Sequence, residues 1–379
     1  MRIGIDGIPL AELKTGVGHY TFEIALGLAR ESPSDSFQIV SHLPFAHAAV
    51  KDLDAPDNLT FIKQPVNQAT RHWWTIGLPL YLKRARLDLF HGTNYDVPVW
   101  GGCPTVLTIH DLSLLLFPAT HEERRVARAR RRLPVMSRRA TMIITPTEAV
   151  KSEVCEHLRV PRDKVVVVNE APRRSFQPMP RDEAAATVRR LGLDEEFILY
   201  VGTIEPRKNL VTLVKAFEEV LRSTPLRPQL VIAGKKGWLT DELFTYIDAA
   251  RLGDRLRLTG YLADDELRAL YSACRVMVYP ALYEGAGLPT LEAMACGAPV
   301  ITTNTPAIVE MVGDHARLFA PADFRALTQH LVELLTTPAA RESLSRTGMK
   351  HAAQFTWERA ARETLAVYRR TGNLARSVL

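Results

Sequence analysis

Short segments of apolar and β-branched residues alternate along this chain with longer segments whose apolar residues recur at helical spacing. That alternation is typical of βαβ units and predicts parallel sheets covered by helices. The apolar runs at 165–168 and 197–201 are continuous, as expected of strands buried on both faces. The strands predicted in the first half are 2–6, 37–41, 59–62, 87–91, 105–109, 142–146 and 164–169. Those predicted in the second half are 197–202, 229–233, 256–259, 276–279, 299–302 and 317–319.

The length of 379 residues predicts two domains, because a single hydrophobic core rarely serves a chain this long. Residues 171–180 contain several prolines and arginines without either period, and they are the predicted linker. We expect doubly wound, Rossmann-like α/β domains at 1–172 and 181–355, followed by a final segment at 356–379. Ligands of such sheets bind beyond the carboxyl ends of the strands, so two facing domains predict a site in a cleft between them.

Composition and charge set limits on the class of protein. A hydrophobic fraction of 46% and a charged fraction of 24% are typical of globular chains. No apolar run reaches the ~18 residues of a membrane span, and the first residues do not resemble a signal peptide, so a cytoplasmic location is expected. The net charge of +6 favours anionic partners and leaves nucleic acid, lipid head groups and phosphorylated substrates open. Four scattered cysteines indicate free thiols, neither disulfides nor a zinc site.

The segment 279–300, YPALYEGAGLPTLEAMACGAPV, carries the strongest functional signal. A strand leads into a glycine-containing loop, and Pro289 suits the first turn of the helix that follows. The N–H groups at such a helix start can hold a diphosphate or a sugar hydroxyl. Glu284 and Glu292 stand seven residues apart around this loop, and carboxylates can bind vicinal hydroxyls. The alternative is that Glu292 complements the helix dipole and that Glu284 is solvated.

The segment 201–210, VGTIEPRKNL, places two adjacent cations in a loop after a strand. Arg207 provides a planar fork of donors and Lys208 a point charge, and both can bind a diphosphate. The alternative is a solvated surface pair.

These two segments resemble glycosyltransferase family 4, whose members are retaining enzymes of the GT-B fold. The hallmark is E-x7-E within a segment much like 284–300. The resemblance implies that Glu284 contacts the transferred sugar, that Glu292 binds the ribose, and that Arg207 and Lys208 neutralise the leaving diphosphate. It also implies donor contacts from the backbone of Gly285, Ala286, Gly287 and Leu288. Two departures are Ala286, where the family usually has phenylalanine, and Thr203, where some members have arginine.

Two further motifs resemble the same family. The segment 15–20, TGVGHY, contains Gly16 and Gly18 in a predicted loop before a helix at 21–29. The resemblance implies that this loop meets the donor diphosphate or the acceptor, and the alternative is a plain tight turn. His110, in T-I-H-D at the end of a predicted strand, would hydrogen-bond the donor sugar, although a histidine there can also be structural. Residues from 355 onward look like the family's closing helix, which crosses back to the N-terminal domain.

Asp52 and Asp54 form a D-x-D pattern, which is the signature of metal-dependent transferases. The surrounding segment 51–58 is polar and contains a proline, so a surface loop is the preferred interpretation. Arg207 and Lys208 already supply the positive charge that a divalent ion would provide. We therefore expect no metal and no cofactor beyond the substrate.

The segment 124–139 is rich in arginine and contains the predicted membrane or acceptor patch of Arg124, Arg128, Arg131 and Arg132. Such a patch would bind anionic lipid, with a solvated helix face as the alternative. We expect some apolar contact from Val126, Leu133, Val135 and Met136. Nucleic acid is not expected, because no recognisable binding module accompanies the charge.

The expected function is retaining transfer of a hexose to a lipid-linked or polysaccharide acceptor in cell-envelope glycan synthesis. GDP-mannose is the favoured donor, because the combined motifs look like those of bacterial polysaccharide mannosyltransferases. A UDP-sugar-dependent transferase, a nucleotide-sugar 2-epimerase and a non-catalytic nucleotide-sugar or lipid-binding protein remain alternatives. The expected location is cytoplasmic and peripheral, at the inner face of the plasma membrane.

Overall fold

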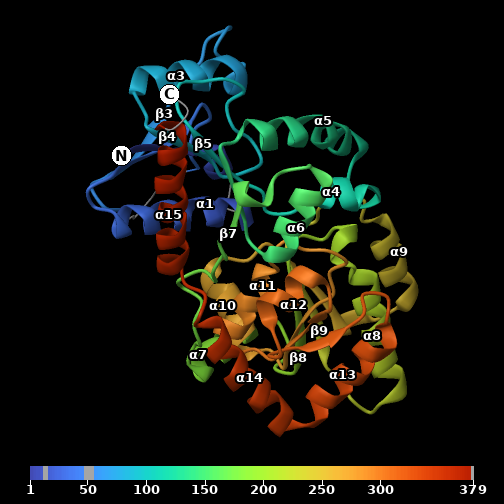
Figure 1. Ribbon diagram of the computed structural model, residues 1–379. Coiled ribbons are helices and arrows are strands. Elements are labelled where there is room, and N and C mark those ends of the chain that lie inside the picture. Colours follow the sequence, from blue (N-terminus) through green and yellow to red (C-terminus); the bar gives the residue numbers. More distant parts are fainter. Residues whose placement is uncertain (12–15, 47–54, 377–379) are drawn as a thin grey trace. The chain divides into compact units, whose positions relative to one another are not determined.

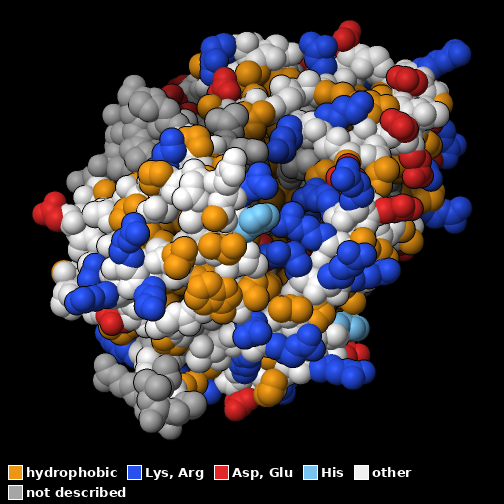
Figure 2. All heavy atoms as spheres, turned by 90° about the horizontal axis from the view of Figure 1, so that it is seen from above, with side chains coloured by type: hydrophobic (Ala, Val, Ile, Leu, Met, Phe, Trp, Pro, Cys, Tyr) orange, Lys and Arg blue, Asp and Glu red, His pale blue; other side chains and the backbone are white. Residues whose placement is uncertain are grey.

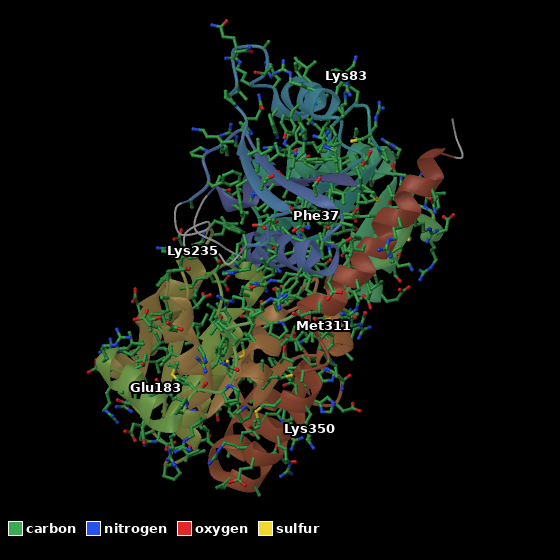
Figure 3. The ribbon with its side chains drawn as sticks, turned by 90° about the vertical axis from the view of Figure 1, so that its left-hand side faces the viewer. Phe37, Lys83, Glu183, Lys235, Met311 and Lys350 are labelled. Atoms are coloured by element: carbon green, nitrogen blue, oxygen red, sulfur yellow. The ribbon has the colours of Figure 1, made fainter. Side chains whose placement is uncertain are left out.

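The computed structural model describes residues 1–11, 16–46 and 55–376, and the chain divides into two compact units (Figure 1). The first unit comprises residues 1–112, 127–170 and 355–379, and the second comprises 113–126 and 171–354. Each unit has its own parallel sheet and its own buried core. Phe37 lies in the sheet of the first unit, and Met311 and Lys350 lie on helices of the second (Figure 3).

In the described part of the first unit, seven parallel strands form a sheet in the order β3-β2-β1-β4-β5-β6-β7. The order doubles back at β1, so the carboxyl ends of β1 and β4 flank the point where the winding reverses. The strands are β1 (Arg2–Asp6), β2 (Ser36–Ser41), β3 (Leu59–Lys63), β4 (Leu89–Gly92), β5 (Thr105–Thr108), β6 (Met142–Thr145) and β7 (Val165–Val167).

The last helix of the chain, α15 (Trp357–Arg376), belongs to the first unit and packs against α1 (Gly16–Glu31). The two helices meet closely at Gly27, where an added Cβ would lie 3.1 Å from the carbonyl oxygen of Trp357. Only glycine therefore permits this approach without a shift. The remaining helices of this part of the chain are α3 (Leu78–Ala85), α5 (Glu123–Arg139), which begins in the second unit, and α6 (Glu148–His157).

The second unit contains a parallel sheet of six strands among its described residues, in the order β10-β9-β8-β11-β12-β13. All residues of β8 and β11, at its centre, are buried, as their continuous apolar sequence predicts. The strands are β8 (Phe197–Val201), β9 (Gln229–Ala233), β10 (Leu256–Gly260), β11 (Val276–Tyr279), β12 (Val300–Thr303) and β13 (Arg317–Phe319).

Amphipathic helices cover this sheet. In α8 (Leu210–Ser223) the buried residues recur at helical spacing, as Leu213, Phe217 and Val220 show. Helix α8 packs against α13, α7 against α10, and α11 against α14. The bounds of these and the other helices are α7 (Arg181–Arg190), α9 (Asp241–Ala250), α10 (Asp264–Ala273), α11 (Leu288–Ala295), α12 (Pro306–Val312), α13 (Phe324–Thr336) and α14 (Pro338–Ala352).

Two glycines bring the loops after β8 and β9 into contact. Gly202 and Gly234 have φ of +150° and +153°. A Cβ on Gly234 would lie 1.9 Å from the carbonyl oxygen of Gly202, which no side chain could tolerate. This close approach sets the path of the chain just before the predicted diphosphate-binding loop.

Residues 113–126 belong to the second unit, although the predicted boundaries assign them to the first. The segment contains α4 (Ser113–Leu116) and a 3-10 turn at Pro118–Thr120. The indole Nε1 of Trp238 donates a 2.9 Å hydrogen bond to the Thr120 carbonyl, and the ring of Phe117 packs 5.0 Å from that of Tyr283. These contacts join residues more than 100 positions apart, which local sequence patterns do not encode.

The predicted fold class is confirmed. Each predicted strand has a counterpart whose bounds differ by two residues at most, and both sheets are parallel. The longest mismatches, of three residues in total, are at β4 and at β7, where only Val165–Val167 pairs with β6. All four cysteines are free, and two of them, Cys274 and Cys296, are buried. Among the described helices, none combines the length and apolarity that crossing a bilayer requires.

Candidate active site

The glycine loop after β11 leads into α11, as the sequence predicts. Gly287 is the N-cap residue with φ of +63°, and its carbonyl accepts hydrogen bonds from the Thr290 backbone N–H and hydroxyl at 2.9 and 2.7 Å. Pro289 lies in the first turn. Gly285, Ala286 and Gly287 are buried, and Leu288 is half-buried as the first residue of the helix. The first turn of a helix leaves backbone N–H groups without intrahelical acceptors, so this end of α11 suits an anionic or hydroxyl ligand.

Arg207 and Lys208 are brought together with Glu284 from the loop after β11. The guanidinium of Arg207 donates hydrogen bonds of 2.8 Å to Glu284 and to the Tyr283 carbonyl, and another of 2.8 Å to Glu205. Lys208 donates to the same Glu284 oxygen, Oε1. Both cations are buried, with exposed fractions of 9% and 8%, so they are not a solvated surface pair.

Aromatic side chains complete the surroundings of Lys208. Its Nζ donates a 2.7 Å hydrogen bond to the Tyr279 hydroxyl and lies 5.1 Å from the centre of that ring. Tyr279 stacks on Tyr200 at 6.2 Å. Burial lowers the pKa of Lys208 and the neighbouring Arg207 lowers it further, whereas Glu284 opposes the shift. A lysine held in so dry a place interacts strongly with any anion that reaches it.

Glu292, the predicted ribose ligand, is buried on α11 and paired with Arg173. Nε and Nη2 of Arg173 donate to the two oxygens of Glu292 at 2.7 and 3.0 Å, and Nη1 donates to Asp264 at 2.7 Å. The simple alternative, in which Glu292 only complements the helix dipole, does not account for this bidentate pair.

His110 lies in the first unit, at the carboxyl end of β5. Its Nδ1 bonds to Glu170 Oε1 and its Nε2 to the Thr93 carbonyl oxygen, each at 2.8 Å. A carbonyl and an ionised carboxylate can only accept hydrogen bonds, so this arrangement places a proton on both ring nitrogens. Burial lowers the pKa of His110, but the charge and hydrogen bond of Glu170, together with the Thr93 carbonyl and Asp111, outweigh it, and the net shift is upward.

A buried chain of hydrogen bonds lies beside this histidine. Tyr20 packs edge-on against the His110 ring at 4.8 Å and bonds to the Thr108 hydroxyl at 2.9 Å. Thr108 bonds to His91 at 2.7 Å, and His91 bonds to Tyr368 of α15 at 2.7 Å. Burial, together with the charge of His110, lowers the pKa of His91 to about 3, so His91 stays neutral. The chain ties the last helix to the strand that carries His110.

Gly16 and Gly18 are not in a loop before the helix, as the sequence suggested, but in the first turn of α1. The helix begins at Gly16 and extends well before the predicted start at residue 21. Gly16 is exposed and Gly18 is buried. Thr15 of the same motif lies outside the described residues, as do Asp52 and Asp54 of the D-x-D pattern.

The predicted basic patch lies on α5, and its members differ in their surroundings. Arg124, Arg128 and Arg131 are exposed, but Arg132 is half-buried and donates to Asp96 at 3.0 and 2.5 Å. The expected apolar contribution of this helix to a membrane is wrong for three residues, because Val126, Leu133 and Met136 are buried within the protein. Lys and Arg side chains gather on the face drawn in Figure 2. Beyond its first turn, which also exposes Glu123, the exposed side of α5 is therefore mainly basic.

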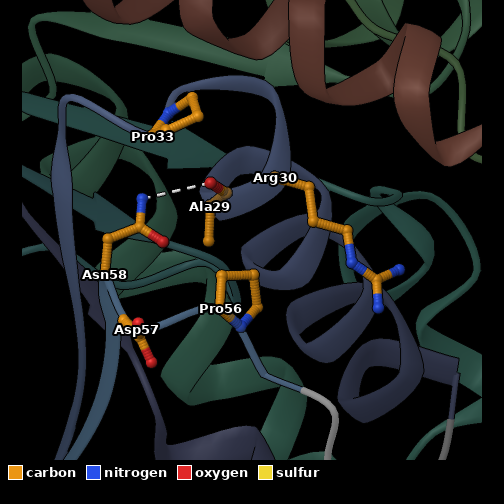
Figure 4. Close-up of a pocket in the computed structure, with 6 residues that line it drawn as sticks. All are labelled: Ala29, Arg30, Pro33, Pro56, Asp57 and Asn58. Carbon is orange, nitrogen blue, oxygen red and sulfur yellow. Dashed lines mark hydrogen bonds between the residues drawn. The ribbon is translucent and has the colours of Figure 1, made fainter.

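Two features bear on where else a ligand could bind. Within residues 1–11, 16–46 and 55–376, no cluster of three His, Cys, Asp or Glu side chains is arranged to hold a metal ion. A pocket of about 440 Å³ in the first unit is lined by Ala29, Arg30, Pro33, Pro56, Asp57 and Asn58 (Figure 4). Its walls precede β2 and β3, so it lies at the amino ends of the strands, opposite the edge where ligands of such sheets bind.

Sequence reasoning missed several residues that now surround the predicted ones. Glu205 is part of the quoted E-P-R-K-N loop, and its spacing from Arg207 could have indicated the ion pair. Glu170 follows β7 at the carboxyl edge of the sheet, which is a usable signal for a site residue. Arg173 and Asp264 offered no signal, because the ion pairs of Arg173 with Glu292 and with Asp264 join positions far apart in the sequence.

Comparison with known proteins agrees with this geometry. Residues 183–351 match the family description "Glycosyl transferases group 1" and residues 15–170 match "Glycosyltransferase Family 4". The O-antigen chain mannosyltransferase B of Escherichia coli is 29% identical over 393 residues, covering 97% of this chain and 100% of that protein. The serotype-specific mannosyltransferase WbdA of Escherichia coli is 30% identical over 290 residues, which is 72% of this chain and 34% of that longer protein.

Among solved structures, HepE of Anabaena in complex with UDP-glucose matches with a TM-score of 0.77 at 15% identity, covering 97% of this chain and 99% of that one. This likeness concerns the fold. The chain therefore belongs to the family 4 glycosyltransferases and has their GT-B fold of two parallel-sheet α/β domains. It is a hexosyltransferase.

Proposed function

We propose that this hexosyltransferase moves mannose from GDP-mannose to a lipid-linked or polysaccharide acceptor during synthesis of a cell-envelope glycan. The observation that carries the proposal is the buried cluster of Arg207, Lys208 and Glu284 beside the start of α11. The choice of mannose is supported by the relatives, an O-antigen chain mannosyltransferase and a serotype-specific mannosyltransferase.

The cluster suits departure of a nucleoside diphosphate. As the bond between the anomeric carbon and the diphosphate oxygen breaks, negative charge grows on the leaving group. Lys208 and Arg207 stabilise that charge from a dry position, and the helix start adds its N–H groups. Glu284 binds both cations and can still accept hydrogen bonds from hydroxyl groups of the sugar, because a carboxylate has about four acceptor positions. Retention of the anomeric configuration is part of the proposal through the family resemblance.

A nucleotide-sugar 2-epimerase needs a base that abstracts a proton, and the pair of His110 and Glu170 is the arrangement to consider. Both ring nitrogens of His110 already donate to acceptors, so neither can accept a proton as the pair stands. This favours the transferase. Detection of an epimerised nucleotide sugar without acceptor would reverse the preference.

The donor is tested by calorimetric titration of the purified protein with GDP, UDP, ADP and dTDP, with no metal added. We expect GDP to bind in the micromolar range and at least tenfold more tightly than the others, and EDTA to leave both binding and turnover unchanged. Tighter binding of UDP would replace GDP-mannose by a UDP-sugar. If EDTA abolishes turnover and magnesium or manganese restores it, metal independence is contradicted. Asp52 and Asp54 would then be candidate metal ligands. Binding of GDP without any turnover of GDP-mannose would support a non-catalytic binding protein.

The acceptor side of the proposal includes peripheral attachment to the inner face of the plasma membrane through α5. Since the apolar face of α5 is buried, attachment would be electrostatic. Each arginine near an anionic surface contributes ~1 kcal/mol. Neutralising Arg128 and Arg131 together to glutamine should therefore weaken binding to phosphatidylglycerol vesicles by roughly 30-fold.

The matched control neutralises Arg189 and Arg190, two exposed arginines on α7. It removes the same charge from another surface and should change vesicle binding by less than about threefold. Co-sedimentation at low salt measures both. Equal losses in the two variants would mean that net charge alone attracts the vesicles, and no loss in either would remove α5 from the proposal.

A further inference from the structure

Arg173 makes an unusually complete set of contacts for a residue in a segment without helix or strand. Its guanidinium forms the bidentate pair with Glu292 and a third hydrogen bond to Asp264 at the start of α10. Its Cζ also lies 4.0 Å from the centre of the Phe176 ring. The Arg173 side chain is only 13% exposed and that of Glu292 only 8%. The guanidinium is thus fixed from three directions.

Arg173 could have one of two roles. It could be a latch that occupies Glu292 until a ligand displaces it, or a fixed partner that orients Glu292. Separating a buried ion pair leaves a buried charge without its partner, which is strongly unfavourable, and here the Asp264 and Phe176 contacts would be lost as well. Burial alone would lower the pKa of Arg173, but Glu292 and Asp264 raise it above its usual value, so the charge is permanent. A guanidinium held this firmly orients its partner and does not release it.

The bidentate pair leaves Glu292 able to bind a ligand. An ionised carboxylate has about four acceptor positions, and a bidentate arginine uses the two that face it. Two positions remain, one on each oxygen, and two neighbouring hydroxyl groups can use them. Without Arg173 the carboxylate could rotate, and the geometry of these positions would be lost.

We propose that Arg173 is a positioning residue that orients Glu292 so that its outer oxygen positions accept the two hydroxyl groups of the donor ribose. The inference rests on the proposed function and adds to it a second residue responsible for recognising the ribose. It predicts that substitution of Arg173 reduces only the part of the nucleotide affinity that depends on the two ribose hydroxyl groups.

The test compares GDP with 2′,3′-dideoxy-GDP by calorimetry, in the wild-type chain and in Arg173→Lys, with the UDP pair run in parallel. Lysine keeps the positive charge beside Glu292 but cannot form the planar fork. We expect the wild type to prefer GDP over the dideoxy analogue by at least tenfold. In Arg173→Lys we expect GDP affinity to fall about tenfold while that of the analogue changes less than twofold, so that the preference disappears. Arg181→Gln, an exposed arginine at the start of α7, is the control and should keep the wild-type preference.

The outcomes separate this inference from the proposed function. If the wild type discriminates and Arg173→Lys does so equally, the positioning role is wrong and the function stands. A parallel loss of affinity for both nucleotides would show a merely structural role, and tighter GDP binding would show a latch; either result overturns the inference. A wild type that binds no nucleoside diphosphate overturns the function and the inference together. Arg173→Gln, which removes the charge and the planar fork together, should reproduce the lost preference.

Discussion

Replacing Lys208 by alanine should slow the release of GDP from GDP-mannose by about 100-fold, measured as kcat/KM. Such a loss corresponds to about 2.7 kcal/mol of transition-state stabilisation, the scale found when one preorganised donor is removed from a growing negative charge. The expectation follows from the burial of Lys208 and from the two bonds that aim its ammonium group, to Tyr279 and Glu284. Both kcat and kcat/KM should fall, because the charge on the leaving diphosphate is greatest in the transition state.

Alanine also leaves Glu284 with one cation fewer in a buried place, and the variant could unfold for that reason. Lys208→Gln avoids this difficulty, because the amide can still donate hydrogen bonds to Tyr279 and Glu284 without carrying charge. Thermal unfolding, followed by circular dichroism, identifies which variants are folded. Lys215→Ala, which alters an exposed lysine on α8, is the matched control and should retain wild-type turnover. Unchanged turnover in folded Lys208→Gln would remove the diphosphate role from this residue.

Replacing Glu170 by glutamine should lower the pKa of His110, which in the wild type lies above its ordinary value of 6.5. The carboxylate opposes the effect of burial in the wild type, and glutamine leaves burial without that opposition. We expect turnover at pH 7 to fall by more than tenfold, because the ring loses the proton that the Glu170 charge retains. The activity of the wild type should fall as the pH rises through the native pKa of His110. In the variant this fall in activity should occur at lower pH.

The effect on stability has a defined sign. Because the pKa of His110 is raised in the folded protein, its contribution to the free energy of unfolding is complete below pH 6.5 and is lost as the pH rises through the native value. Glu170→Gln should weaken that pH dependence, which urea denaturation at pH 6 and pH 8 will measure, because it removes the carboxylate that raises the pKa in the folded protein. An NMR titration of the His110 ring protons reports the pKa directly. Glu156→Gln, an exposed carboxylate on α6, should change neither measurement. A wild-type pKa below 6.5 would contradict the charged pair.

The strands and the motif-bearing loops could be predicted because their signals are local. Continuous apolar runs such as 197–201 identify buried parallel strands, and glycine and proline mark the turn into α11. The carboxyl ends of parallel strands share one edge of a sheet, which is why the loops after β8 and β11 bring Arg207, Lys208 and Glu284 together. The first turn of α1 was harder to place, since glycine is a poor helix former and suggested a loop.

The sequence by itself determined the fold class, the two sheets and the residue types at the candidate site, because hydrophobic periodicity and turn chemistry act over a few residues. Only the tertiary structure decided which partner each charged side chain has. It paired Glu170 with His110, Arg173 with Glu292 and Arg132 with Asp96. It also assigned residues 113–126 to the second unit. Such pairings join positions far apart in the chain, and burial in a medium of low dielectric makes them strong, so they depend on where the whole fold places each charge.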